Sequence, residues 1–549
     1  MKKLPVLLLL FCALTIQAQR DYYWVKFKDK DSNPFSLANP QAYLTDASIE
    51  RRSFQHIQLD STDLPLTPAY VNGLSPFIDY LKHRLKWLNM VVVKVTVQAN
   101  LDSIKALPYV DTLGPIYYVP PIAGKKSKFE DWYAPVDQTY GQHPVYGAGY
   151  RQINQLNADL LHQLGYRGQG ILMGMMDNGI YRGDLVTGLD SVRSRIIATW
   201  DFVHDEENVY NDGSHGLETF SCVAGNLPGK FLGTAPDASF VLSTTEDDNA
   251  EWVMEEYNWA AGAEFADSLG ARIFSTSLGY TGFDNDTGSH TYADMTGNKT
   301  VITRAANIAA TKGILVINSA GNEGNNSWHY IAAPADGDKV IAIGALDSAS
   351  KVQGFSSKGP NAAGRVKPDL CAMGAHAGII EPYGSVTTNN GTSFSCPIMA
   401  GCFASLWSAF PDKTADEIYT AVVISADHFW APDSSFGYGI PNFYNAYILL
   451  KYNYNGNILQ ISPYPRVFPN PFSETLNISY YNEGKDGTHK LELFNLQGQL
   501  MLSREVYMRA NTFEVFNIEE AGKLAAGTYV FRFDGDKKFS SQVIKFNKF

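Results

Sequence analysis

The chain has 549 residues, which is too long for one ordinary domain, so two to four domains are expected. Hydrophobic residues make up 45% of the chain and charged residues 18%, proportions that exclude an intrinsically disordered protein. The net charge of −12 argues against nucleic acid as a partner, because binding to phosphates requires clustered Lys and Arg.

Residues 1–18 have the pattern of a secretory signal peptide. A basic start precedes a short apolar run that ends at Ile16, and a small residue precedes a polar one at Ala18-Gln19. A buried N-terminal helix fits this abrupt polar change poorly. No later segment reaches the roughly 18 uninterrupted apolar residues of a transmembrane helix. The sequence therefore predicts an exported protein with no membrane-spanning segment.

Residues 19–128 are expected to form a small α/β domain followed by a linker. Strand-like runs of aromatic and β-branched residues alternate here with helix-like runs. The expected elements are strands at 23–27 and 90–95 and helices at 75–85 and 101–107. The stretch from Pro120 to Lys128 contains Pro and Lys and is typical of an exposed linker.

From 149 to 450, short apolar strands alternate with helical segments. The strands are expected at 170–177, 240–244, 272–275, 313–318 and 340–345. These runs are apolar on both faces, as in parallel strands that are covered by helices on either side. Right-handed crossovers would then build a doubly wound parallel sheet, so the expected fold class is α/β.

Residues 462–549 begin as a turn-rich linker and continue as alternating strands. The strands are expected at 476–480, 490–494, 513–516, 528–533 and 542–546. Regular short strands separated by turn signals are typical of a small β-sandwich.

Three segments of the central region place reactive side chains at strand ends or helix starts. Asp177 ends an apolar strand, which is where ligands bind in open α/β sheets. His215 opens a predicted buried helix, and Ser393 lies at the start of another helix made of small apolar residues. Taken alone, each has a simpler interpretation: a capping Asp, a structural His and an N-cap Ser.

In combination these residues match the needs of nucleophilic catalysis. A serine hydroxyl needs a neighbouring base, and the base needs an acid that fixes its tautomer. Asn322 follows another apolar strand and could supply the side-chain donor of an oxyanion hole, next to the helix N-terminus at Ser393. The order Asp, His, Ser disfavours a hydrolase of the esterase type, which has the order Ser, Asp, His and a Gly-x-Ser-x-Gly motif.

The motifs of the central region resemble those of the subtilases. The matching segments are Met175-Met176-Asp177-Asn178-Gly179-Ile180, Ser214-His215-Gly216, Ser319-Ala320-Gly321-Asn322-Glu323-Gly324 and Gly391-Thr392-Ser393. The resemblance covers roughly 149–450 and implies a subtilisin-like peptidase domain. It implies a triad of Asp177, His215 and Ser393, with Asn322 in the oxyanion hole.

The resemblance also implies where a peptide substrate binds. The substrate-binding residues would be Ser277, Leu278, Gly279, Ser319, Ala320 and Gly321. The first three would pair with an extended peptide, and the last three would form one wall of the primary pocket, where small residues favour a large apolar side chain. The acidic tract at 245–256 either selects basic substrates or is a solvated face. The chemistry requires no cofactor, and although calcium is common in subtilases, no calcium-binding loop is readable.

Departures from the family pattern are modest. Leu217 stands where the family usually has Thr, and Met373 stands where it usually has Pro. Neither position transfers a proton or stabilises charge. The intact triad and oxyanion residue disfavour the main alternative, an inactive surface-binding protein on a subtilase fold.

Four cysteines remain after the signal peptide. They are Cys222, Cys371, Cys396 and Cys402. Buried free thiols are expected, because four cysteines in a chain of this size do not make a disulfide framework. The sequence has no Cys-x-x-Cys or His-Glu-x-x-His motif, so no metal site is predicted.

The flanking regions also have family counterparts. Residues 19–128 are similar to subtilase propeptides, which assist folding and inhibit the enzyme until they are cleaved. Residues 462–549 resemble type IX secretion sorting domains, which direct export from the periplasm of a Gram-negative bacterium to the cell surface or the medium. A generic β-sandwich accessory or carbohydrate-binding domain is the alternative. The expected partners are protein substrates, the chain's own propeptide and the type IX secretion machinery.

Overall fold

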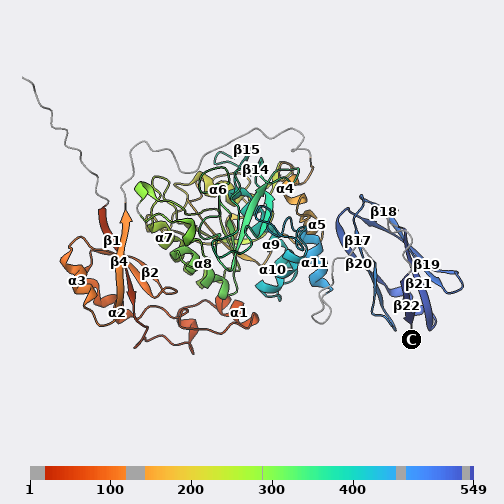
Figure 1. Cartoon of the computed structure of the whole chain (residues 1–549), viewed down its shortest axis with the longest axis horizontal. Coiled ribbons are helices and arrows are strands. Elements are labelled where there is room, and N and C mark those ends of the chain that lie inside the picture. Colours follow the sequence, from red (N-terminus) through yellow and green to blue (C-terminus); the bar gives the residue numbers. More distant parts are fainter. Residues whose placement is uncertain (1–18, 119–142, 287, 453–464, 535–543, 549) are drawn as a thin grey trace, which may run out of the picture.

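The computed structural model shows three folded regions in chain order: an N-terminal α/β region, a central region and a C-terminal β region (Figure 1). It describes residues 19–118, 143–286, 288–452, 465–534 and 544–548. The expected signal peptide and the linker from Pro120 to Lys128 lie outside the described residues.

Seven parallel strands form the central sheet, in the order β13-β12-β11-β10-β5-β9-β6. They are β5 (Leu172–Asp177), β6 (Ile196–Asp201), β9 (Ser239–Thr244), β10 (Ile273–Thr276), β11 (Leu315–Ser319), β12 (Val340–Leu346) and β13 (Leu370–Met373). Every residue of the last four strands is buried, which explains their continuous apolar sequences. The five expected strands are confirmed, and β6 and β13 extend the sheet at its edges.

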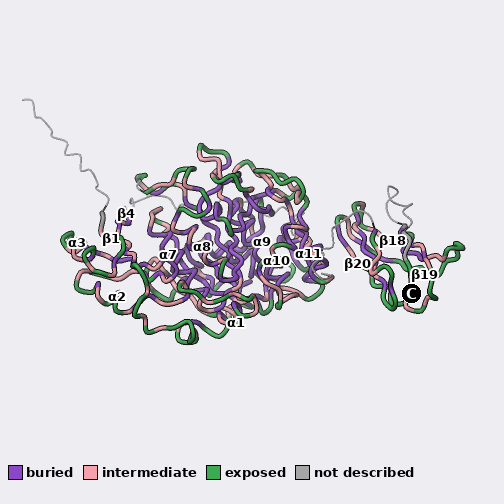
Figure 2. The backbone as a smooth tube through the Cα atoms, turned by 60° about the horizontal axis from the view of Figure 1, so that its bottom comes forward, coloured by how far each residue is buried: buried purple, intermediate pink, exposed green. Residues whose placement is uncertain are grey.

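Helices cover both faces of this sheet. α6 (Ser214–Ala224) and α9 (Thr392–Ala409) share one hydrophobic core with it, whereas α7 (Met254–Ser268) and α8 (Val301–Thr311) share the other. Figure 2 shows that the buried backbone is concentrated here. The doubly wound α/β class is therefore confirmed. The remaining elements of the region are α4 (Tyr150–Asn154), α5 (Asp159–Gln163), β7 (Asn226–Leu227), β8 (Phe231–Leu232), β14 (Ala377–Ile380), β15 (Val386–Asn389), α10 (Ala415–Ile424) and α11 (Phe443–Lys451).

The N-terminal region is a four-stranded antiparallel sheet with the order β2-β3-β1-β4. Its elements are β1 (Gln19–Phe27), α1 (Asp46–Phe54), α2 (Pro68–Gly73), β2 (Tyr80–Leu85), β3 (Met90–Lys94), α3 (Ala99–Lys105) and β4 (Val110–Tyr118). The helix expected at 75–85 is wrong. Only Ser75–Phe77 forms a short 3₁₀ helix, and pairing with β3 holds Tyr80–Leu85 as strand β2, with His83 and Leu85 buried.

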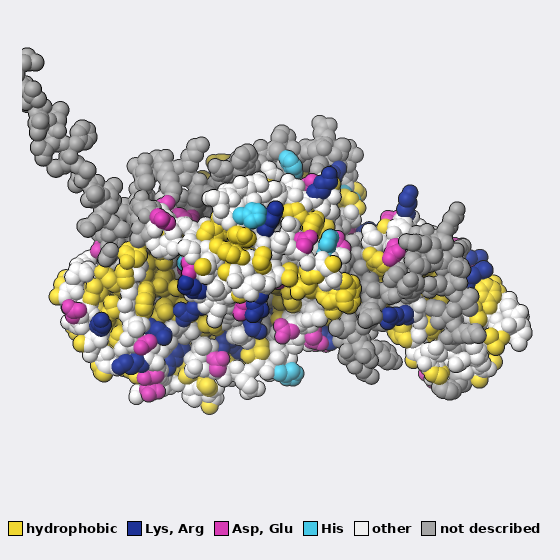
Figure 3. Space-filling model, viewed as in Figure 1, with side chains coloured by type: hydrophobic (Ala, Val, Ile, Leu, Met, Phe, Trp, Pro, Cys, Tyr) yellow, Lys and Arg dark blue, Asp and Glu magenta, His cyan; other side chains and the backbone are white. Residues whose placement is uncertain are grey.

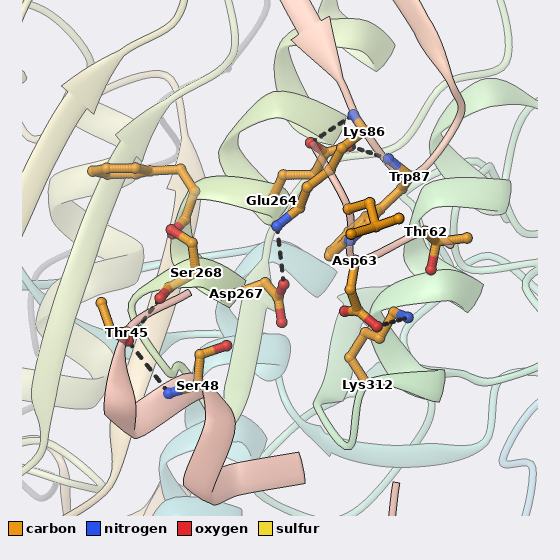
Figure 4. Close-up of polar contacts among 12 residues, drawn as sticks. Thr45, Ser48, Thr62, Asp63, Lys86, Trp87, Glu264, Asp267, Ser268 and Lys312 are labelled. Atoms are coloured by element: carbon orange, nitrogen blue, oxygen red, sulfur yellow. Dashed lines mark hydrogen bonds and ion pairs between the residues drawn. The ribbon is translucent and has the colours of Figure 1, made fainter. Parts of the chain in front are cut away.

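This N-terminal sheet packs against α7 of the central region. Apolar residues of both regions belong to one core, to which the sheet contributes Leu85, Trp87, Leu88, Met90, Val92 and Ile116. Glu264 of α7 accepts the backbone N–H groups of Lys86 at 2.9 Å and Trp87 at 2.8 Å, which fixes the turn after β2 to the helix (Figure 4). Burial raises the pKa of Glu264 to about 7.

A buried ionic cluster makes a second contact between the two regions. Arg51 and Arg52 of α1 both donate to Asp267 of α7, with Arg52 Nη2 2.9 Å from Asp267 Oδ1. Asp63 bridges Arg52 and Lys312. Its Oδ1 lies 2.8 Å from Arg52 Nη2, and its Oδ2 lies 2.9 Å from Lys312 Nζ, a contact that Figure 4 shows. None of the five side chains is more than 2% exposed. Buried charges of this kind depend on every partner being present.

The C-terminal region is a β-sandwich of two sheets, with the orders β16-β17-β20 and β19-β18-β21-β22. Its strands are β16 (Arg466–Phe468), β17 (Leu476–Asn482), β18 (Gly487–Asn495), β19 (Leu500–Met508), β20 (Thr512–Ile518), β21 (Gly527–Asp534) and β22 (Ile544–Lys548). Both sheets contribute to one core. The expected strands are present, although residues 542 and 543 of the last one lie outside the described residues. Two strands were not expected: β16, which lies in the stretch expected to be a linker, and β19, an edge strand with mostly exposed residues.

Surface charge is mixed on the face of the molecule that Figure 3 shows. Lys and Arg side chains are interspersed there with Asp and Glu among the coloured residues. Within the described stretches, no helix has both the length and the apolar composition needed to cross a membrane.

Candidate functional site

His215 and Asp177 lie side by side at the end of β5. Nδ1 of His215 is 2.7 Å from Oδ1 of Asp177, and the other Asp177 oxygen accepts the Thr219 hydroxyl at 3.1 Å. Asp177 is 4% exposed and His215 is 7% exposed. A carboxylate bound to Nδ1–H holds the imidazole in the tautomer whose Nε2 can accept a proton.

The start of α6 approaches the loop after β5 closely enough to bring this pair together. The side-chain oxygen of Asn178 accepts the backbone N–H of Gly216 at 2.8 Å. A Cβ on Gly216 would lie only 1.9 Å from the carbonyl oxygen of Gly179, so a larger residue there would push the two segments apart. Gly216 therefore lets the loop after β5 approach the start of α6.

Ser393 is the second residue of α9 and is 9% exposed. Its Oγ lies 3.4 Å from the carbonyl oxygen of Ser277, and the Ser277 hydroxyl donates to the Ser393 carbonyl oxygen at 2.7 Å. The ring of Phe394 lies 6.0 Å from the ring of His215, so the start of α9 is beside the Asp–His pair. A helix N-terminus presents backbone N–H groups that attract negative charge.

Asn322 is fixed by Thr392, the residue before Ser393. Its Oδ1 accepts both the backbone N–H and the hydroxyl of Thr392, each at 2.9 Å. The amide oxygen is thereby engaged, so the Nδ2 group is the part of Asn322 that can donate to a ligand. This role of Thr392 was not predicted from the sequence. The available signal was its position between Gly391 and Ser393.

A pocket of about 250 Å³ contains Asn322, Thr392 and Ser393 together with residues of the predicted peptide-binding segments. Its lining includes Ser277, Leu278, Gly279, Ser319, Gly321, Asn322, Thr392 and Ser393. Ala320 differs from the expectation, because its side chain is fully buried in a small cluster with Ile331, Ala335 and Ala342 instead of facing the pocket.

Two titratable side chains near Ser393 have shifted pKa values. Burial lowers the pKa of His215, but the charge and hydrogen bond of Asp177 outweigh burial and raise it above its usual value. Burial raises the pKa of Cys396 to about 12, so this thiol does not compete as a nucleophile. All four cysteines in the described part of the chain are buried and free, as expected.

The acidic tract at 245–256 is not a solvated face. Glu246 is 3% exposed, Glu255 is 0% and Glu256 is 1%. Glu246, Glu251 and Glu255 each place one carboxylate oxygen within 4.8 Å of the other two. Hard cations such as Ca²⁺ prefer oxygen ligands, so this cluster has donor chemistry that fits calcium, which sequence reasoning did not reveal.

Comparisons with known proteins assign each of the three regions. A family model described as "Subtilase family" matches residues 168–439. One described as "Peptidase S8 propeptide domain, Bacteroidota" matches residues 22–130. A third, "Secretion system C-terminal sorting domain", matches residues 466–546. The exact domain boundaries drawn from the sequence stay predictions.

Curated relatives match the same central part of the chain. Subtilisin E of Bacillus subtilis (strain 168) is 31% identical over 307 residues, which are 55% of this chain and 70% of that protein. Subtilisin of Bacillus pumilus is 31% identical over 294 residues, 52% of this chain and 94% of that protein. Serine protease AprX of Bacillus subtilis (strain 168) is 30% identical over 314 residues, 51% of this chain and 64% of that protein. Given these relatives, the parallel α/β fold and the matched regions on either side of it, the chain belongs to the subtilase family of serine proteases, with an S8 propeptide domain before the peptidase domain and a secretion sorting domain after it.

Proposed function

We propose that the protein is a secreted serine endopeptidase in which Asp177, His215 and Ser393 act as a catalytic triad. The observation that carries this proposal is the buried Asp177–His215 hydrogen bond of 2.7 Å beside the start of the helix that bears Ser393. Asn322 lies in the same pocket as Ser393, with its amide oriented by Thr392.

The mechanism is acyl transfer through a covalent intermediate. His215 Nε2 takes the Ser393 proton as Oγ attacks the scissile carbonyl carbon, and Asp177 stabilises the imidazolium that forms. Asn322 Nδ2 and the backbone N–H of Ser393 receive the developing oxyanion. His215 then protonates the leaving amine, and water, activated by the same imidazole, hydrolyses the acyl-enzyme. No cofactor takes part in these steps.

The flanking domains suggest how the enzyme is delivered and controlled. The sorting domain supports export by the type IX machinery, from the periplasm of a Gram-negative bacterium to the cell surface or the medium. The contacts of the N-terminal domain support a zymogen. This domain binds α7 of the peptidase domain through a shared hydrophobic core and a buried ionic cluster. Its cleavage would then release the active enzyme.

Casein hydrolysis by the protein freed of its N-terminal region tests this function. Cleavage that is blocked by a fluorophosphonate supports a serine endopeptidase. If the processed protein cleaves no protein substrate and does not react with the fluorophosphonate, the proposal fails and an inactive surface-binding role replaces it.

Replacing Asn322 with alanine is expected to lower kcat by about 10²–10³-fold and to change KM little. The magnitude is that of removing the equivalent donor from subtilisin, and the reason is that this amide binds the oxyanion of the transition state. Steady-state kinetics on a peptide substrate measure it. A matched change, Asn326→Ala, removes an exposed amide nearby and is expected to leave kcat within about threefold. A loss in Asn322→Ala that appears mainly as a higher KM would contradict the oxyanion role.

As the pH is lowered, kcat/KM is expected to fall, with a midpoint above pH 6.5. His215 must be neutral to accept the Ser393 proton, and Asp177 raises its pKa above the usual value. Protonation of His215 therefore removes activity as the pH falls through this raised pKa. The dependence of kcat/KM on pH for the processed enzyme reports the pKa in the free enzyme. An acid limb at or below about 6.5, the ordinary histidine value, would show that Asp177 does not act on His215 as described.

A further inference from the structure

The pocket that contains Ser393 is acidic as well as polar. Besides the residues named above, Glu246, Glu251 and Glu323 line it. None of the described residues that line it is a Lys, Arg or His. A concave site with walls of one charge concentrates ligands of the opposite charge.

The carboxylates of Glu246 and Glu255 are held in place by hydrogen bonds. Glu255 accepts the backbone N–H groups of Asp247 at 2.7 Å and of Trp252 at 3.2 Å, which folds the segment around it. Glu246 accepts the hydroxyl of Tyr280, the residue that follows the predicted peptide-binding segment. Burial and the neighbouring carboxylates keep the pKa of Tyr280 well above its usual value, so the hydroxyl stays a neutral donor. Three carboxylates this close give this part of the pocket a negative charge, which attracts cationic groups.

The acidic segment is also tied to the catalytic residues. The backbone N–H of Thr245 donates to the carbonyl oxygen of Asp177 at 2.8 Å, so the segment leaves β9 beside the Asp–His pair. From there Glu246 and Glu251 share the pocket with Leu278 and Gly279, along which the acyl side of a peptide would lie. A peptide extended along Leu278 and Gly279 would therefore pass close to the two carboxylates.

We propose that Glu246 and Glu251 form a subsite for a Lys or Arg side chain in the part of the substrate that precedes the scissile bond. This inference rests on the proposed peptidase function and specifies its substrate class. The cationic group would bind the two carboxylates by charge-assisted hydrogen bonds, and its aliphatic stem would pack along Leu278 and Ala332 of the pocket wall. The apolar preference expected from the small residues at 319–321 concerns the primary pocket and stays a prediction.

The chain's own sequence has the charge that such a subsite would bind. β1 lies close to the acidic segment, because the ring of Tyr22 packs edge-on against that of Trp252 with centroids 6.0 Å apart. β1 pairs with β4, and the first basic residues after β4 in the sequence are Lys125, Lys126 and Lys128. The sequence between the propeptide and peptidase domains is thus complementary in charge to the pocket.

Fluorogenic peptides that differ only in Lys, Arg or Leu at each of the four positions before the scissile bond test the proposal on the processed enzyme. At one or more positions the basic residue is expected to raise kcat/KM about 10- to 100-fold over Leu, the range of a charge-assisted hydrogen bond. In Glu246→Gln/Glu251→Gln this ratio is expected to fall by about tenfold or more. The matched control Glu207→Gln removes an exposed acid of the same domain and is expected to keep the ratio.

Each other result has a defined meaning. If wild type cleaves none of the peptides and no casein, the proposed function itself fails. If the peptides are cleaved with no preference for Lys or Arg, or if the double variant keeps the preference, the subsite is wrong. If there is no basic preference but Ca²⁺ raises the Tm of wild type and not of the double variant, the carboxylates bind a divalent cation instead, and the inference is overturned.

Discussion

Ser393→Ala is expected to lower the rate of peptide-bond cleavage by about 10⁶-fold, the magnitude known for loss of the nucleophile in subtilisin. His215→Ala is expected to cost about as much, because the hydroxyl is a weak nucleophile without its base. The double variant is expected to be no worse than either single variant. Residues that act as one unit fail together, so their losses do not add.

Self-cleavage of the full-length chain measures this loss of activity, and mass spectrometry of the intact protein follows it over time. Wild type is expected to lose its N-terminal region, whereas both variants keep it. Ser395→Ala is the matched control, since its hydroxyl bonds the Thr392 carbonyl oxygen on the same helix at 2.9 Å without a role in the chemistry. Processing of Ser393→Ala at the wild-type rate, or additive losses in the double variant, would contradict the shared role.

Asp267→Ala is expected to weaken binding of the cleaved N-terminal domain by about 10²–10³-fold. Removing one partner of a buried ion pair costs about 3–5 kcal/mol, because it leaves an uncompensated charge in the interior. Here two guanidinium groups would lose their partner, since Arg51 and Arg52 both bind Asp267. Burial alone would raise the pKa of Asp267, but these two cations outweigh burial and hold it far below the usual value.

Co-elution of the cleaved domain with the processed enzyme in size-exclusion chromatography, over a range of concentrations, gives the dissociation constant. Arg52→Ala makes the same test from the other side and leaves the mature enzyme unchanged. Asp237→Ala is the control, because its pairing with Arg167 at 2.7 Å is partly exposed and such a pair contributes at most about 1 kcal/mol. Equal retention of the domain in Asp267→Ala and Asp237→Ala would show that the buried cluster does not hold it.

Local sequence was sufficient to predict five of the seven strands of the central sheet and the reactive residues at their ends. Strands buried on both faces must be apolar throughout, so they stand out from the helices between them. Asp177 ends one such strand and Asn322 follows another within a few residues, and the ends of parallel strands meet at one edge of a sheet. The pairing of Asp177 with His215 follows from that geometry and from the room that Gly216 leaves.

Contacts between distant segments could not be predicted in the same way. Tyr80–Leu85 has a composition that suits a helix as well as a strand, and pairing with β3 decides the outcome. Glu246 and Glu255 look like surface residues in the sequence and are buried because the chain folds around them. The bond from Arg52 to Asp267 joins residues that are 215 positions apart, and no local pattern reveals such a pair.

The most direct test of the central claim is to locate the covalent adduct of a fluorophosphonate probe. The processed protein is labelled, digested and sequenced by mass spectrometry. The triad geometry predicts one adduct, on Ser393, that disappears in His215→Ala while the protein stays folded by circular dichroism. An adduct on another residue, or none on a protein that cleaves casein, would contradict Ser393 as the nucleophile.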